Sequence, residues 1–177
     1  MLDSLLCIIQ ILLGTKKKNK AIFLDFDGVL ATEEYTDSLI AKGKDTQDKY
    51  GRLFNPRNIE MLDFIIRQTN AGIVVTSDWR NYLSMWGIVR MWKYRKLPGI
   101  IIGITPTVSI NRGDEIDKWL CKHLEIRDYV ILDDMDYKQF RKEQRPYLVT
   151  TNHFSGLDNS SSSMAINILK GATRTGE

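Results

Sequence analysis

The chain has 177 residues, of which 43% are hydrophobic and 27% are charged, and its formal net charge is +3. This length suits one domain with a substantial core, and the composition excludes a disordered or fibrous chain. The mild positive charge is compatible with an anionic ligand and excludes a strongly basic, histone-like protein. The two cysteines, Cys7 and Cys121, are too few for a disulfide framework, so we interpret them as reduced thiols of a cytoplasmic protein.

The first 19 residues differ from the rest, because an almost wholly apolar run, 5–13, is followed by a lysine-rich stretch, 16–20. The run is much shorter than the roughly 20 apolar residues that a membrane-spanning helix needs. It also lacks the basic start and the cleavage site of a signal peptide, so we expect no stable membrane span. We predict a short helix packed on the body and a basic linker. Docking of a partner or a membrane surface, or self-association, is the alternative.

From residue 20 to residue 172, short apolar runs alternate with helical patterns, which predicts one domain followed by a tail over 173–177. The predicted strands are Ala21–Leu24, Gly72–Thr76, Ile100–Ile104, Tyr129–Leu132 and Tyr147–Thr150. None shows polar alternation, which is typical of strands buried on both faces of a parallel sheet. The helical patterns cover residues 58–68, 80–95, 114–124 and 160–170. This order predicts an α/β fold with a central parallel sheet flanked by helices.

A polar interval, 31–53, separates the first predicted strand from the first body helix. It is too long for a tight connection between a strand and a helix. In open α/β sheets, ligands bind beyond the carboxyl ends of the strands, and this interval follows such an end. We therefore predict that it is a small insertion that caps a site.

Carboxylates and hydroxyls follow three of the predicted strands. They are Asp25 and Asp27 after the first strand, Thr76 and Ser77 after the second, and Asp133 and Asp134 after the fourth. In extended chain, alternate side chains point the same way, so Asp25 and Asp27 can share a direction, and Gly28 allows a sharp turn after them. Converging carboxylates repel one another unless a cation lies between them. A hard divalent ion with oxygen ligands, most simply Mg²⁺, removes this repulsion.

These segments resemble three motifs of the haloacid-dehalogenase-like (HAD) hydrolases. The matching stretches are Asp25-Phe-Asp-Gly-Val-Leu30, Val75-Thr-Ser77 and Leu132-Asp-Asp134, within a likeness that covers about residues 20–170. The resemblance implies a three-layer, Rossmann-like HAD core with a minimal insertion cap. It also implies a Mg²⁺-dependent phosphatase, because most members of the superfamily are such enzymes.

A narrower likeness is to a small HAD subgroup whose members occur alone or fused in multi-enzyme RNA-repair proteins. It is carried by Thr76-Ser-Asp-Trp-Arg80, Arg112-Gly-Asp-Glu-Ile116, Trp119-Leu120 and Gly156-Leu157. This likeness implies that the phosphorylated substrate is an RNA or DNA end.

The resemblance also implies roles for the acidic residues. Asp25 would be the nucleophile that forms an aspartyl-phosphate, and Asp27 would protonate the leaving oxygen and then activate water. Mg²⁺ would be held by Asp25, by the backbone carbonyl of Asp27 and by Asp134, with Asp133 as a further ligand or as its support.

The substrate phosphate also needs hydrogen-bond donors and a cation. The resemblance implies that Thr76 binds a phosphate oxygen, with the Ser77 amide nearby. It requires a Lys or Arg before the last motif, for which Arg112 and Lys118 are the candidates. Lys118 falls on the predicted solvent face of its helix, whereas Arg112 precedes that helix and can reach the strand ends, so we favour Arg112. We expect Arg80 to orient the substrate, with a plain salt bridge as the alternative.

Two other features have open interpretations. Residues 79–96 contain three of the tryptophans and five basic residues, which indicates either nucleic-acid contact or an ordinary amphipathic helix. His153 lies in the loop after the last predicted strand, where it could touch substrate.

The favoured hypothesis is thus a Mg²⁺-dependent phosphohydrolase whose small cap leaves room for a bulky or macromolecular phosphoester. One alternative is a small-molecule nucleotide or sugar phosphatase on the same fold. The other is a non-catalytic interaction module, which the presence of mutually repelling carboxylates makes the weaker hypothesis.

Overall fold

The central feature of the fold is a five-stranded sheet in which every pair of neighbouring strands is parallel. The computed structural model describes residues 18–171. Residues 1–17 of the predicted N-terminal segment and the predicted C-terminal tail therefore lie outside the described residues. Across the sheet, the strands are β5 (Ile101–Ile104), β4 (Gly72–Val75), β1 (Lys20–Leu24), β6 (Asp128–Asp133) and β7 (Leu148–Thr150). All five predicted strands are present, and the predicted α/β class is confirmed.

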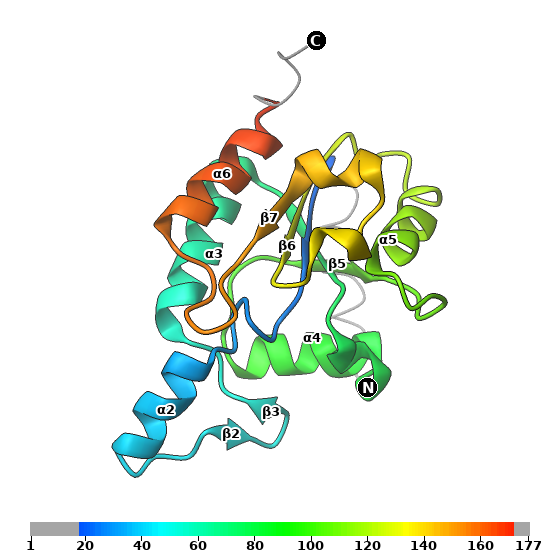
Figure 1. Cartoon of the computed structure of the whole chain (residues 1–177). Coiled ribbons are helices and arrows are strands. Elements are labelled where there is room, and N and C mark those ends of the chain that lie inside the picture. Colours follow the sequence, from blue (N-terminus) through cyan, green and yellow to red (C-terminus); the bar gives the residue numbers. More distant parts are fainter. Residues whose placement is uncertain (1–17, 172–177) are drawn as a thin grey trace.

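Helices cover both faces of this sheet, which makes three layers (Figure 1). Helices α3 (Pro56–Thr69) and α6 (Asn159–Leu169) lie side by side on one face, and α5 (Arg112–Leu120) lies on the other. Strand β1 contributes to both cores, since Ile22 and Leu24 pack in one buried cluster and Ala21 and Phe23 pack in the other. The missing polar alternation in this strand therefore follows from burial on both faces.

The helix predicted over 80–95 is divided in two. A short 3₁₀ turn, η1 (Asp78–Asn81), is followed by α4 (Met85–Tyr94). Ser84 caps the start of α4, since its hydroxyl accepts from the Gly87 amide. Trp79 and Trp92 are buried, as in an ordinary amphipathic element, whereas Trp86 is half-exposed.

Helix α5 ends at Leu120, before the predicted limit of 124. Leu124, which follows the helical spacing of the inward residues, is 86% exposed, so its predicted burial is wrong. The chain leaves the helix through turns in which the amides of Lys122 and His123 bond to carbonyls three residues back. Cys121, at the end of this helix, is an exposed free thiol.

The polar interval 31–53 forms a helix and a small hairpin beside the end of β1, as Figure 1 shows. These elements are α2 (Glu33–Ala41), β2 (Gln47–Asp48) and β3 (Gly51–Arg52). The Arg95 guanidinium at the end of α4 holds the hairpin through two bonds to the Asp48 carboxylate, of 2.7 and 3.0 Å. The insertion is therefore fixed to the body by a partly buried ion pair.

Two further short 3₁₀ turns, η2 (Tyr137–Gln139) and η3 (Lys142–Tyr147), connect β6 to β7. Within residues 18–171, no helix is long and apolar enough to cross a membrane.

Asn58, buried at the start of α3, joins the loop after β1 to the loop after β7. Its side-chain amide donates to the carbonyls of Val29, at 2.8 Å, and Ser155, at 3.0 Å. Gly156 fits against this amide because a side chain at that position would overlap the Asn58 nitrogen. One buried side chain thus sets the distance between two loops at the carboxyl edge of the sheet.

We expect Asn58→Ala to lower the free energy of unfolding by about 1–3 kcal/mol, because two carbonyls lose their donor in a buried place. Chemical denaturation measures this change. Glu60→Ala, on the exposed side of the same helix, is the control and should change stability by about 0.5 kcal/mol or less. Equal effects of the two substitutions would contradict the role of Asn58.

Candidate active site

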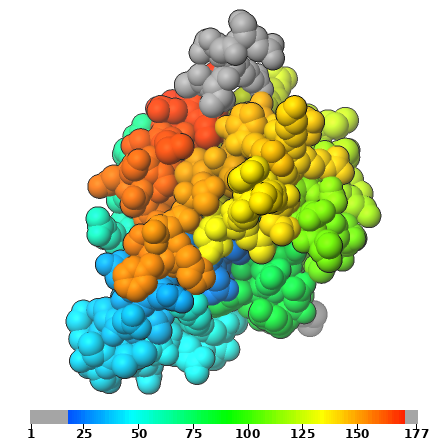
Figure 2. Space-filling view, viewed as in Figure 1, coloured from blue at the N-terminus to red at the C-terminus, as the bar shows by residue number. Residues whose placement is uncertain are grey.

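The predicted site residues meet at the carboxyl edge of the sheet because the three central strands end at the same level. Leu24, Val75 and Leu132 are aligned across β4, β1 and β6. The next backbone groups continue this alignment, since the Asp25 amide donates to Leu132 and the Thr76 amide donates to Leu24. Figure 2 shows blue atoms from the beginning of the described chain between the green, yellow and orange surfaces.

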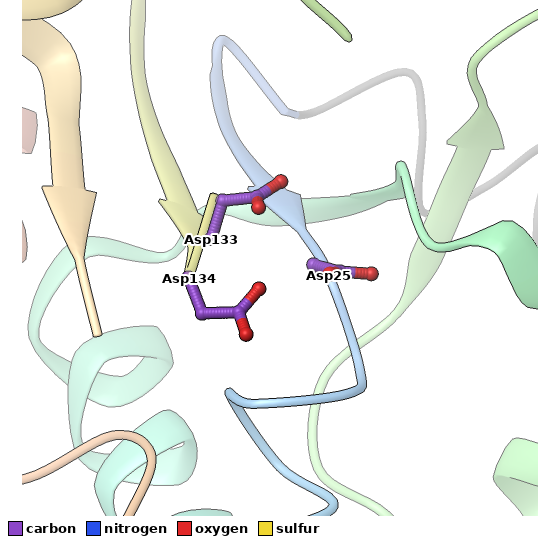
Figure 3. Close-up of side chains that lie close together, drawn as sticks. All are labelled: Asp25, Asp133 and Asp134. Atoms are coloured by element: carbon purple, nitrogen blue, oxygen red, sulfur yellow. The ribbon is translucent and has the colours of Figure 1, made fainter. Parts of the chain in front are cut away.

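Asp25, Asp133 and Asp134 form a cluster in which one oxygen of each carboxylate lies within 4.8 Å of the others. Figure 3 shows the side chains of Asp133 and Asp134 leaving the end of one strand toward that of Asp25. Asp25 and Asp133 are buried. The Asp27 carboxylate does not belong to this cluster, and the predicted ligation through the Asp27 backbone carbonyl stays a prediction.

The burial of these carboxylates changes their acidity. Burial, together with the charge of Asp25, raises the pKa of Asp133 to about 7. Burial also raises the pKa of Asp25, although the Arg112 guanidinium, the Phe26 amide and the Ser77 hydroxyl oppose this rise. In the absence of a cation, the cluster therefore retains protons at pH values where free carboxylates are fully ionised.

The donor set fits a hard divalent cation. It consists only of carboxylate oxygens, which are the ligands that Mg²⁺ prefers in proteins. Gly28, with a φ of +70°, packs directly on the Asp134 carboxylate, and a side chain at this position would overlap it. The chain therefore uses a glycine both to turn after β1 and to leave space for one member of the cluster.

Arg112 occupies the position expected for the phosphate-binding cation. It is buried at the start of α5, and its guanidinium lies 3.4 Å from Asp25 and 3.2 Å from Asp133. Asp78 lies near the same guanidinium, at 3.8 Å. Lys118 is exposed on another side of α5 and lines a separate cavity. The structure thus brings Arg112, and not Lys118, to the carboxylates.

Thr76 and Ser77 contribute hydroxyls from the end of β4. The Thr76 Oγ1 atom is buried and has no hydrogen-bond partner among the described residues. A buried donor of this kind is costly unless a ligand accepts from it. The Ser77 hydroxyl, in contrast, hydrogen-bonds the Asp25 carboxylate, and the predicted contact of the Ser77 amide with substrate stays a prediction.

Arg80 is paired inside the protein. Its side chain is 3% exposed, and its guanidinium bonds to the Glu115 carboxylate of α5 and to the Thr76 carbonyl. Arg80 thus forms the plain salt bridge that the sequence offered as the alternative to a contact with substrate. Arg80 therefore positions the Thr76 loop against α5.

Two partners of Asp27 were not recognised in the sequence. The indole nitrogen of Trp79 donates to one Asp27 oxygen at 2.8 Å, and the Arg52 guanidinium lies 3.4 Å from the other. Arg52 comes from β3 of the insertion and also donates to the Thr36 hydroxyl of α2 at 3.1 Å. No local pattern predicts these contacts, because they join segments that are 25 and 52 residues apart.

A comparison with family models gave one decisive match. The model that describes the HAD domain in Swiss Army Knife RNA repair proteins matches residues 21–161. The chain belongs to this family. It is therefore a HAD-family hydrolase domain, which confirms the resemblance seen in the sequence.

Two other comparisons do not change the family assignment. A search of curated protein sequences gave no match. The solved structure of a putative HAD superfamily (subfamily III A) hydrolase from Legionella pneumophila is similar, with 12% identity and a TM-score of 0.42 over 99% of this chain and 98% of that chain.

His153 also lies at the edge of the HAD carboxylate cluster, although its sequence position offered no partner. Its Nδ1 atom bonds to the Asp134 carboxylate, and its Nε2 atom lies 3.4 Å from a Glu33 oxygen of α2. The hydrogen bond to Asp134 raises the pKa of His153. The contact of His153 with Glu33 was missed because Glu33 belongs to the insertion, whose helix was not predicted.

We expect Mg²⁺ to raise the melting temperature more at pH 8 than at pH 5. The folded-state pKa of Asp133, about 7, exceeds its ordinary value of 3.8, so the metal-free folded protein binds the extra proton between these values. Metal-free stability contributed by this group is thus present at low pH and is lost as the pH rises through about 7. Mg²⁺ needs ionised ligands and competes with these protons at low pH.

Thermal melts with EDTA or with millimolar Mg²⁺ at the two pH values measure this difference. Asp134→Asn is the matched variant and should lose most of the Mg²⁺-dependent shift. A shift of equal size at both pH values, or one retained in full by Asp134→Asn, would contradict the assignment of the cluster.

Proposed function

We propose that this HAD domain is a Mg²⁺-dependent phosphatase that acts through an aspartyl-phosphate, with a nucleic-acid end as its substrate. One observation carries the proposal: the Asp25 carboxylate belongs to a group of three carboxylates that could hold a cation, and it also lies 3.4 Å from the buried Arg112 guanidinium. This is the arrangement of charge that phosphoryl transfer needs, because catalysis of this reaction depends on positioning and on neutralising negative charge.

In the first step, an Asp25 oxygen attacks phosphorus and the bond from phosphorus to the leaving oxygen breaks. Asp27 supplies the proton that the leaving oxygen takes up. Its carboxylate lies outside the cluster, so it is available for proton transfer while Trp79 and Arg52 hold it. In the second step, Asp27 takes a proton from water, the water oxygen attacks phosphorus, and the bond to Asp25 breaks. Inorganic phosphate and free Asp25 are the products.

Arg112 and Thr76 are the protein groups suited to the transferring phosphoryl oxygens. Arg112 offers a buried cation next to Asp25, and the Thr76 hydroxyl is a buried donor whose acceptor is not among the described residues. When bound, Mg²⁺ would be held by Asp25, Asp133 and Asp134 and would neutralise charge on the phosphate.

The proposed substrate class rests on three observations. The matched family is described by its occurrence in RNA repair proteins. The insertion consists of one helix and one two-stranded hairpin, so it covers little of the surface beside the site. The net charge of +3 suits a polyanionic substrate.

We expect Mg²⁺-dependent hydrolysis of p-nitrophenyl phosphate that falls by about 10³-fold or more in Asp25→Asn, because the amide cannot form the aspartyl-phosphate. The rate of phosphate release in the steady state measures the activity of both proteins. Asp63→Asn, on the outer side of α3, is the control and should keep full activity. Wild-type protein without Mg²⁺-dependent turnover of any phosphoester would falsify the proposed chemistry.

The same assay distinguishes the substrate class. RNA oligonucleotides with a 3′- or a 5′-phosphate should give a higher kcat/KM than free nucleotides. Equal values would limit the proposal to a phosphatase of small molecules.

Trp79→Phe should lower kcat about tenfold or more with little change in KM, because the ionised Asp27 that takes the proton from water in the second step loses a hydrogen-bond donor. Phe retains the aromatic packing of Trp79 with Phe26, whose ring centroid lies 5.5 Å away. Trp92→Phe is a matched control, since its indole donates to the Pro98 carbonyl and not to Asp27. Equal losses in the two variants would show that Trp79 serves packing alone.

A further inference from the structure

A cavity with cationic side chains in its wall lies at the carboxyl end of β5, outside the carboxylate cluster. It is a cavity of about 300 Å³ lined by Arg80, Ile104, Thr105, Pro106, Thr107, Lys118, Trp119 and Lys122. Three of these side chains are cationic and none is acidic. Two threonines add hydroxyls and the other lining residues are apolar, so the cationic side chains are what suits this cavity to an anion.

The two lysines of this cavity have no acidic partner in the described part of the chain. The acidic residues of α5 are engaged elsewhere, since Asp114 and Asp117 pair with Arg141 and Glu115 pairs with Arg80. Lys118 and Lys122 are four positions apart and line the same hollow. Lys122 follows the end of α5, and two neighbouring cations without an acidic partner repel each other, so a bound anion would remove an unfavourable interaction.

The cavity is connected to the Thr76 loop by two hydrogen bonds. Arg80 forms part of its wall and bonds to the carbonyl of Thr76. The Thr105 amide donates to Val75, the residue before Thr76, at 3.0 Å. In the sheet order, β5 is separated from β1, the strand that leads to Asp25, only by β4.

We propose that this cavity binds a backbone phosphate of the nucleic-acid strand whose end enters the active site. The inference rests on the proposed function and deepens it, because it gives the enzyme an interaction that a free nucleotide or a sugar phosphate cannot make. Lys118 and Lys122 supply the charge, and the buried Arg80–Glu115 pair fixes the wall between the two sites.

The test uses the double variant Lys118→Glu/Lys122→Glu and a control with the same change of charge at the other edge of the sheet. The control is Arg67→Glu/Lys170→Glu, at the carboxyl ends of α3 and α6, where the chain approaches the start of β4 and β1. All four side chains are exposed, so both proteins should fold. Lys118→Gln/Lys122→Gln separates loss of attraction from added repulsion.

Fluorescence anisotropy measures binding of a single-stranded RNA that carries no terminal phosphate, at several salt concentrations. We expect the Glu variant to bind about tenfold or more weakly and to reduce the slope of log K against log[salt] by about 0.7 for each phosphate that the protein no longer neutralises. The Gln variant should fall between this variant and wild type. The control should stay within about twofold, and all variants should hydrolyse p-nitrophenyl phosphate at the wild-type rate.

Unchanged RNA affinity in the Glu variant, or an equal loss in the control, would overturn the inference. Wild-type protein that binds inorganic phosphate through these lysines but does not bind RNA would also overturn it, since the cavity would then serve a small anion. The p-nitrophenyl phosphate assay remains independent of these results. Absent RNA binding with full phosphatase activity therefore rejects the cavity proposal alone, and absent phosphatase activity rejects the proposed function.

Discussion

Repulsion among three neighbouring carboxylates dominates the carboxyl edge of the sheet. Asp25, Asp133 and Asp134 lie within 4.8 Å of one another, and two of them are buried. Isolated charges in such a place are costly, and a chain can keep them only if protons or cations compensate. The raised pKa of Asp133 and the Arg112 guanidinium provide this compensation within the protein, and a divalent ion would complete it.

The surrounding elements hold these groups in place. The parallel register of β4, β1 and β6 brings three strand ends to one level, and Gly28 leaves space for the Asp134 carboxylate. Arg80 then fixes the Thr76 loop to α5. Much of the buried polar network at this edge thus serves the geometry of the site, which is the expected use of buried charges that contribute little net stability.

The insertion has a second effect besides covering part of the site. Arg52 of the hairpin reaches the Asp27 carboxylate, and Glu33 of α2 reaches His153, so both of its parts contact residues beside the carboxylate cluster. The orientation of Asp27 therefore depends on the insertion as well as on the core. Arg95 joins the same hairpin to α4, which makes the insertion part of one packed body with the rest of the domain.

Elements with local signals could be predicted from the amino-acid sequence. The five apolar runs became the five strands, and the acidic and hydroxyl residues after β1, β4 and β6 were found because strand ends are recognisable and because their motifs resemble those of a known superfamily. The sequence also favoured Arg112 over Lys118, because helical periodicity tells which residue can face the sheet.

The partners of these residues could not be predicted before the fold was known. The contacts of Asp27 with Trp79 and Arg52, of His153 with Glu33, and of Arg80 with Glu115 join distant segments and follow from the packing of side chains in three dimensions. The early end of α5, which leaves Leu124 exposed, was likewise beyond periodicity, because the spacing of apolar residues continues past the last helical turn. Local patterns identify which groups carry the chemistry, whereas the orientation and acidity of those groups depend on neighbours that the chain brings together only when it folds.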